Sequence, residues 1–338
     1  MRATEALTAR VAPAVGCSAG GAVPPRAQHR VARGSRRHLA AWAVTLALAG
    51  ASCATPAPLS RDATDLYRRA LAQFTGHSIR LQTIAQRIQI ANRELCGDEL
   101  APVLGVVALR AVDLPRDLRA IGRAQLGRGP SPVVVGLVAS SAAARAGVAV
   151  GDQILSIGRT AARGPASIYA PARVRADTVA MRVRRGAETR TIEVANDEGC
   201  RFFSELVDSE GFNAYATGAQ IVVYTGMMRI LDRDPSLAFV LGHELAHDIV
   251  YAREGRRARD AADEGRADHL GAYLAERGGY QLEPRDFGLA RAAALPDREL
   301  GASTTHPAAP ARLAAFERTL REIADRRAAG ATMLPDSF

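Results

Sequence analysis

The first periodic pattern along the chain is helical. In the segment 61–95, apolar residues recur at alternating spacings of three and four, at Leu81, Ile84, Ile88, Ala91 and Leu95. This spacing brings side chains to one face of an α-helix. We therefore predict one or two helices over this segment, with the apolar stripe serving as a packing face.

Beyond residue 100 the pattern changes to short strands and turns. Residues 132–138 are a continuous apolar run, whereas Val179, Met181 and Val183 alternate with arginines. Both patterns predict strands. Between them, residues 140–158 contain an Ala-rich stretch, a glycine and an apolar run, which predicts a short helix, its C-cap and another strand.

The third part of the chain begins near residue 201 and combines a short strand with long helices. Residues 221–224 are strand-like, and Asp234-Pro235 provides an N-cap followed by Pro at the first helical position, which predicts a helix to about Ala252. Together the patterns predict an α+β fold. Its parts are a leader over 1–53, a helical segment over 54–99, a β-rich domain over 100–197, and a mainly helical domain with a small edge sheet over 198–338.

Composition limits the class of protein. Of the 338 residues, 48% are hydrophobic, which is enough for compact domains, and a mean hydropathy of -0.05 excludes a multi-span membrane protein. The net charge of +9 is concentrated at the start, because residues 1–52 hold seven Arg and one acid. We therefore expect no nucleic-acid partner.

Residues 1–53 have the parts of an export leader. Several Arg precede an uncharged apolar stretch, small residues follow it, and Cys53 comes next. Three interpretations stay open: a cleaved signal peptide, a lipoprotein with its lipid on Cys53, and an uncleaved membrane anchor. Each predicts export to the bacterial cell envelope with the bulk of the chain in the periplasm, and the last two attach it to the membrane.

Two cysteines, Cys96 and Cys200, stand at the ends of the predicted β-rich domain. In an exported chain this placement predicts a disulfide that clamps the two ends of an inserted domain. Two unrelated thiols are the alternative.

The clearest chemical motif lies in the helix predicted to begin near Asp234. It is His-Glu-Leu-Ala-His at residues 243–247. His243 and His247 project from one helix face, so both imidazoles can reach one Zn²⁺, and Glu244 between them can take a proton from water and deliver it to a leaving amine. An ordinary pair of surface His is the alternative, but the apolar residues around this helix indicate burial.

A catalytic zinc needs a third protein ligand and an open fourth position. Acids close in sequence are Asp248, Glu254, Asp260, Asp263 and Glu264, of which Glu254 is disfavoured because it lies in a charged turn. Asp268 is at i+4 from Glu264 and shares its helix face. We predict that Asp268 accepts the ring N–H of a ligand His, and a plain surface acid is the alternative.

These residues resemble one family. The motif at 243–247 followed by Glu-Gly-Arg-Ala-Asp at 264–268 resembles peptidase family M48, the gluzincins that include CAAX prenyl proteases and BepA-type periplasmic peptidases. The resemblance implies that His243, His247 and Glu264 bind one Zn²⁺ per chain and that Glu244 is the general base.

The same resemblance implies roles for residues outside the motif. An edge strand formed by Asn213, Ala214, Tyr215 and Ala216 would align the substrate backbone. His306 and Arg312 would polarise the scissile carbonyl and stabilise the oxyanion. In some relatives the equivalent His instead closes over the metal as a latch.

Residues 140–158 resemble the central block of bacterial PDZ domains, and the resemblance extends over about residues 100–196. It implies a groove that takes an extended peptide, often a C-terminus, as an added strand. Residues 104–106 are the candidate carboxylate-binding loop. A degenerate domain that only packs against its neighbour is the alternative.

The sequence therefore predicts a zinc metalloendopeptidase of the cell envelope. Its PDZ-like domain would recruit or gate unfolded or C-terminally exposed protein substrates. A non-catalytic adaptor with a structural or latched zinc site is the main alternative, and the intact Glu244 argues against it. A PDZ-linked serine protease is disfavoured because the His residues are spaced for a metal.

Overall fold

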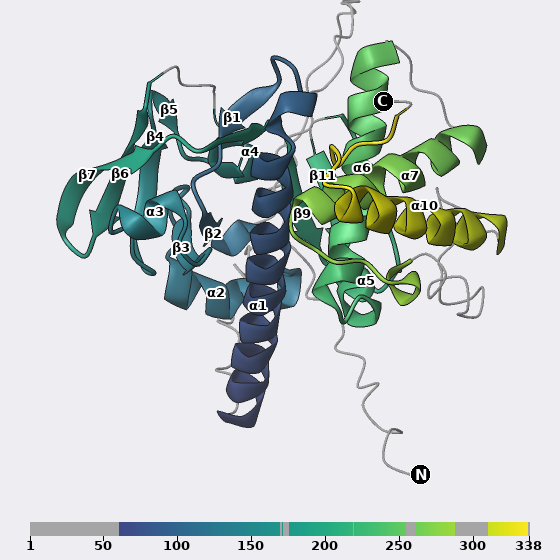
Figure 1. Cartoon of the computed structure of the whole chain (residues 1–338). Helices are drawn as coiled ribbons and strands as arrows, with labels where there is room; N and C mark the ends of the chain where they lie inside the picture. The colour runs from purple at the N-terminus through teal and green to yellow at the C-terminus, as the bar shows by residue number, and fades with distance from the viewer. Residues whose placement is uncertain are drawn as a thin grey trace, which may run out of the picture. The chain divides into compact units, whose positions relative to one another are not determined.

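The structure is a computed structural model that describes residues 61–169, 171, 176–218, 220–254, 261–287 and 310–336 (Figure 1). The predicted leader, with Cys53, lies outside the described residues, and so does His306. No helix within these ranges is long and apolar enough to cross a membrane. The described part is α+β, as the sequence predicts, and the domain boundaries given above stay predictions.

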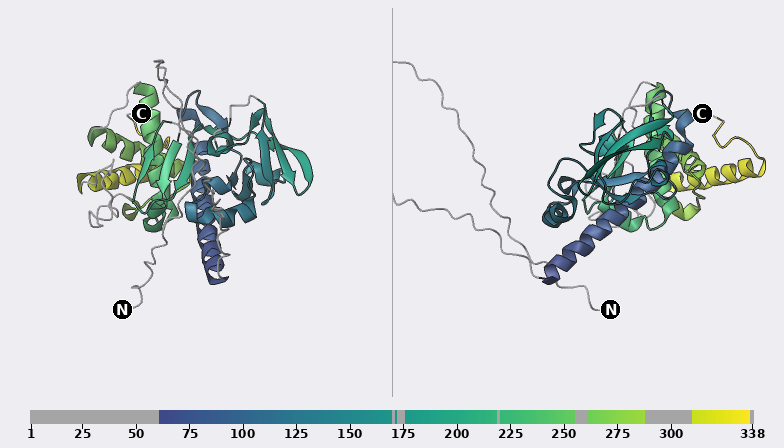
Figure 2. Two further views of the ribbon diagram at one scale, coloured as in Figure 1. Left: turned by 180° about the vertical axis from the view of Figure 1, so that it is seen from behind. Right: turned by 90° about the vertical axis from the view of Figure 1, so that its left-hand side faces the viewer.

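The segment predicted to be helical is formed by helix α1 (Arg61–Ala91) and the short 3₁₀ turn η1 (Arg93–Leu95). Leu81, Ile84 and Ile88 are buried, so the predicted stripe is a packing face. Figures 1 and 2 show α1 passing between the strands that follow it and the helices of the C-terminal part, and it contacts elements of both.

The helix α1 also carries buried glutamines that the apolar stripe did not predict. The amide of Gln82 donates to the carbonyl oxygen of Ser204 at 2.6 Å, and that of Gln89 donates to the carbonyl oxygen of Phe202 at 2.6 Å. Ser204 belongs to strand β9 (Phe203–Val207). The glutamines therefore supply donors along the side of β9 that no described strand pairs.

The β-rich part forms one antiparallel sheet of order β2-β3-β4-β6-β7, with β5 paired to β4. Alternate residues of β6 face its core, where Met181 and Val183 pack with Val134 and Ile154. The strands are β2 (Val106–Leu109), β3 (Val133–Leu137), β4 (Gln153–Ile157), β5 (Thr160–Ala161), β6 (Thr178–Arg185) and β7 (Glu188–Ala195). The helical turns between them are η2 (Ala111–Asp113), η3 (Arg116–Leu118), α2 (Arg119–Leu126), α3 (Ala142–Arg145) and α4 (Pro165–Tyr169).

The C-terminal part combines helices with a small sheet of order β10-β11-β9. In this sheet β11 pairs antiparallel with β10 and parallel with β9. The elements are β10 (Ala214–Ala216), β11 (Gln220–Tyr224), α5 (Thr225–Ile230), α6 (Asp234–Glu254), α7 (Ala261–Arg277), η4 (Pro284–Asp286) and α10 (Pro310–Ala328). Helix α6 packs against α7, α1 and the sheet, so the segment with the chemical motif is central to this part.

A disulfide joins Cys96 and Cys200, whose Cα atoms are 5.5 Å apart. Beside it, strand β1 (Leu100–Pro102) pairs antiparallel with β8 (Glu198–Cys200). The disulfide and this two-stranded ladder bring together the two ends of the β-rich part, a sequence separation of 104 residues.

Candidate metal centre

The chemical motif of helix α6 is deeply buried. His243, Glu244 and His247 are 3%, 2% and 5% exposed, and the neighbouring Leu241 and Leu245 are buried as well. Polar groups removed from water in this way need partners from adjacent elements. The partners come from helices α7 and α10.

Helices α6 and α7 approach each other closely at a pair of glycines. A Cβ atom at Gly242 would come within 2.4 Å of the carbonyl oxygen of Gly271, and one at Gly271 within 2.7 Å of the backbone of His243. Because neither residue has a Cβ atom, the two helices pack backbone to backbone. This contact sets α7 beside the motif, with Glu264 about two turns before the crossing.

His243, His247 and Glu264 form a triangle of ligand atoms. The two Nε2 atoms are 3.1 Å apart, Oε2 of Glu264 lies 3.6 Å from Nε2 of His243, and Oε1 of Glu264 lies 3.4 Å from Nε2 of His247. In a tetrahedral site with bonds of about 2.0–2.1 Å to zinc, ligand atoms are about 3.3 Å apart. The three separations match this value, so the residues fit one Zn²⁺. Within the described ranges, His243, His247 and Glu264 are the three residues whose ligand atoms lie close enough together to hold one metal ion.

Asp268 connects the triangle to helix α10. Its Oδ1 lies 2.9 Å from Nδ1 of His243. This carboxylate holds the ring proton on Nδ1, so that the lone pair of Nε2 points toward the triangle. On its other side, Asp268 accepts two hydrogen bonds of 2.7 Å from Arg312, whose Nη1 also lies 3.2 Å from Oε2 of Glu264.

The charges of this network offset one another. Burial raises the pKa of Asp268, but hydrogen bonds from Arg312 and His243 outweigh burial and hold the pKa below its ordinary value. Burial lowers the pKa of Arg312, whereas Asp268, Glu264 and Glu244 raise it, and the net shift is upward. Arg312 therefore stays a cation among buried acids.

An aromatic cluster seats α10 against α6. The ring centroid of Phe239 is 4.7 Å from that of Phe316 and 5.6 Å from that of Phe287. The guanidinium of Arg312 lies 5.7 Å from the centroid of Phe287. These contacts position Arg312 beside Asp268. Sequence reasoning missed the cluster, because Phe residues far apart in the chain give no local pattern.

The role that the resemblance implied for Arg312, stabilising the oxyanion, stays a prediction, and in the structure Arg312 contacts two carboxylates. Its guanidinium is bound to Asp268 and lies beside Glu264, so its charge acts on one triangle residue and on the carboxylate that contacts His243. The physical reason is the two buried carboxylates, which need a cation close by. The residue expected to act with it, His306, lies outside the described residues.

The predicted substrate strand is present as β10, which contains Ala214, Tyr215 and Ala216, with Asn213 just before it. β11 pairs with one side of β10, and no described strand pairs with the other. β10 packs beside α6. An extended peptide backbone could therefore add to the open edge of β10 close to the motif.

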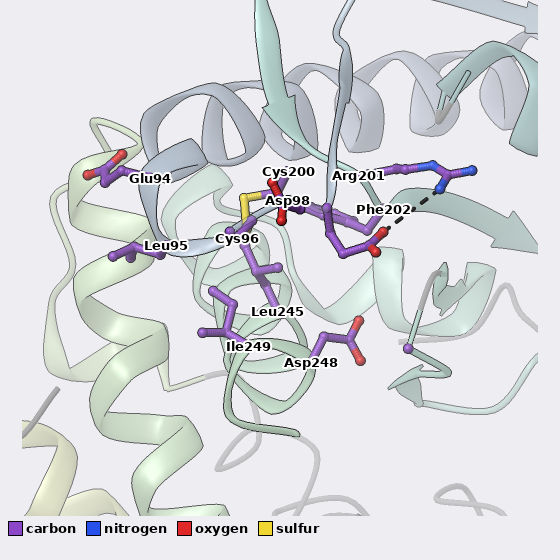
Figure 3. A pocket seen from close by; sticks show the side chains of 13 residues that line it. Glu94, Leu95, Cys96, Asp98, Cys200, Arg201, Phe202, Leu245, Asp248 and Ile249 are labelled. Atoms are coloured by element: carbon purple, nitrogen blue, oxygen red, sulfur yellow. Dashed lines mark ion pairs between the residues drawn. A yellow bond between two sulfur atoms is a disulfide. The ribbon is translucent and has the colours of Figure 1, made fainter. Parts of the chain in front are cut away.

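A pocket of about 510 Å³ lies against another face of α6 (Figure 3). Leu245 and Ile249 line it together with the Cys96–Cys200 disulfide, and Asp248 lies at its side. Leu245 and Ile249 each follow a motif His by two residues, which turns them away from the triangle. Asp248, considered as a third ligand from the sequence, is not part of the triangle.

The comparison with family models bears on this centre. Residues 175–258 match the model of peptidase family M48. The matched range includes the motif at 243–247 and ends before Glu264, Asp268 and Arg312. M48 peptidases are zinc-dependent, so the match and the triangle together support a metallopeptidase domain with a zinc site.

Comparisons with individual proteins add little. No curated protein matches the chain. Among solved structures the chain is similar to one described as "HtrA-type protease AlgW with decapeptide", with 28% sequence identity and a TM-score of 0.24. The similarity covers 30% of this chain and 30% of that chain.

Proposed function

We propose that this protein is a zinc metalloendopeptidase of the bacterial cell envelope. Its substrates are unfolded or C-terminally exposed proteins of that compartment, and the PDZ-like domain recruits them or regulates their cleavage. The observation that carries the proposal is the buried triangle of His243, His247 and Glu264, with Glu244 between the two His in sequence. A structural metal site has no need of a further buried carboxylate in that place.

In the proposed hydrolysis, different residues bind the metal and transfer the proton. His243, His247 and Glu264 would hold Zn²⁺, which when bound would supply Lewis acidity toward the scissile carbonyl and make water a stronger nucleophile. As the oxygen of the attacking water bonds to the carbonyl carbon, Glu244 accepts a proton from that water. Glu244 then passes the proton to the amide nitrogen as the C–N bond breaks. The oxygen of the water thereby becomes part of the new carboxyl group, and the transferred proton becomes part of the new amine.

Other groups orient the reactants. The edge of β10 aligns the substrate by backbone hydrogen bonds, which places one peptide unit beside the triangle. Asp268 fixes the ring of His243, and Arg312 fixes Asp268. Burial of the whole group strengthens each of these electrostatic contacts.

A cleavage assay with two inhibitor classes tests the proposal. The purified protein should degrade fluorescent casein, 1,10-phenanthroline should abolish the degradation, and added Zn²⁺ should restore it. A serine-directed sulfonyl fluoride should have no effect, because no Ser takes part. Degradation that resists the chelator, or that the sulfonyl fluoride stops, would contradict a zinc mechanism.

A further inference from the structure

Strand β2 ends the antiparallel sheet of the β-rich part. β3 pairs with one side of it, and no described strand pairs with the other. In an edge strand, the backbone N–H and C=O groups of every second residue point to the unpaired edge. The N–H and C=O of Ala108 point to this outer edge of β2. An edge of this kind accepts an extended peptide as an additional strand.

The side chain of Tyr169, at the end of helix α4, occupies this edge. The N–H of Ala108 donates to the Tyr169 hydroxyl at 3.0 Å, and the hydroxyl donates to the carbonyl oxygen of Ala108 at 3.2 Å. One side chain thus takes both hydrogen bonds that an added strand would make with Ala108. Burial raises the pKa of the hydroxyl, and the carboxylates of Asp113 and Glu205 add to the rise, so the group keeps its proton.

Little space remains between β2, α4 and α1. The cavity there has a volume of about 10 Å³, which is at most enough for one water molecule. Its lining includes the buried side chains of Leu104, Val106, Ile168 and Gln86. A peptide carboxylate or side chain needs more room, so the edge is closed to a ligand while Tyr169 is in place.

The helix that carries Tyr169 also touches the C-terminal part. α4 packs against both β2 and β9. β9 is the parallel neighbour of β11, and β11 pairs with β10, the candidate substrate strand. A movement of α4 that withdraws Tyr169 from Ala108 would therefore change the packing of this helix against β9.

We propose that Tyr169 is a gate that closes the outer edge of β2. An extended peptide with apolar side chains, which suit the apolar residues beneath the edge, binds only after the hydroxyl has left Ala108. Opening through a movement of α4 would alter the contact of this helix with β9, which lies in the same sheet as β10. The consequence for proteolysis rests on the proposed function, whereas the gate itself does not.

Peptide affinity tests the gate in the full chain. Tyr169→Phe keeps the ring and loses both hydrogen bonds, so the closed state is weakened and peptide affinity should rise about tenfold. The probe is a fluorescein-labelled pool of decapeptides with randomised apolar C-terminal residues and free carboxylates, followed by fluorescence anisotropy. Every protein compared carries Glu244→Gln, which is expected to slow cleavage of the probe by about two to four orders of magnitude. Tyr67→Phe, on α1 and outside the cavity lining, is the matched control and should not change the affinity.

Hydrogen exchange gives a second readout that needs no ligand. The amide of Ala108 should exchange about tenfold faster in Tyr169→Phe than in the parent chain. Equal exchange together with equal peptide affinity, including no binding by either protein, would overturn the gate. Because peptide binding and amide exchange are measured rather than cleavage, the result is independent of whether the proposed peptidase activity is correct.

Discussion

Replacing Glu244 with Gln is expected to lower kcat for casein cleavage by about two to four orders of magnitude while the zinc content stays unchanged. Glu244 is 2% exposed and is not one of the three triangle residues. Gln keeps the size of the side chain, but its amide does not accept a proton from water at neutral pH. Initial rates and zinc content by mass spectrometry measure the two effects separately.

A matched substitution on the surface provides the control. Glu188→Gln removes a carboxylate from the exposed start of β7 and should leave both the rate and the zinc content as they are. If Glu244→Gln lost its zinc together with its activity, Glu244 would support the metal rather than transfer a proton. Undiminished cleavage by Glu244→Gln would equally contradict its role as the base.

The second large effect concerns Arg312. Arg312→Met should lower the free energy of unfolding by about 3–5 kcal/mol and weaken zinc binding about 10- to 100-fold. The substitution leaves two buried carboxylates, those of Asp268 and Glu264, without the cation that lies within 3.2 Å of both. Urea unfolding and competition with a zinc chelator measure the two quantities.

Arg318→Met, at an exposed position of the same helix, is the control and should change neither quantity. A third outcome separates the two interpretations of Arg312. If Arg312→Met keeps its stability and zinc affinity while kcat falls, the guanidinium acts on the substrate, as the family resemblance implied. In that case the positioning role through Asp268 would be wrong.

The features that were predictable from the sequence are those with a local signature. His243 and His247 are four residues apart in a helix, and this spacing alone places both rings on one face. Alternation at Val179, Met181 and Val183 likewise predicted the strand that the structure has as β6. In both cases the period of the element decides where the side chain points, so no tertiary information is needed.

Other features depend on contacts between distant segments. Arg312 comes 44 residues after Asp268, and no pattern near either residue indicates that they form a bidentate pair. Gln82 has the polarity of a surface residue, yet it is buried because a carbonyl of β9 needs a donor. The helix-interior glycines Gly242 and Gly271 were a usable signal, since glycine in a helix lowers stability unless a close approach requires it.

The two hydrogen bonds between Tyr169 and Ala108 likewise depend on contacts between distant segments. The resemblance of residues 140–158 to a PDZ block implied a groove that takes an extended peptide, and in the structure the Tyr169 hydroxyl bonds to the backbone of Ala108 while Gln86 lines the small cavity beside β2. Both side chains come from segments outside that block. A local motif predicts the strand that a ligand could use, but whether the chain itself covers the strand is a matter of tertiary packing.

The central claim, that the triangle on α6 and α7 is the zinc centre, is tested most directly by locating the metal. Crystals of the Glu244→Gln protein, grown without chelator, should give one anomalous peak per chain in data collected at the zinc absorption edge. The account predicts that this peak lies within bonding distance of His243 Nε2, His247 Nε2 and a carboxylate oxygen of Glu264. A protein that contains one zinc per chain but shows the peak elsewhere, or coordination that omits Glu264, would contradict it.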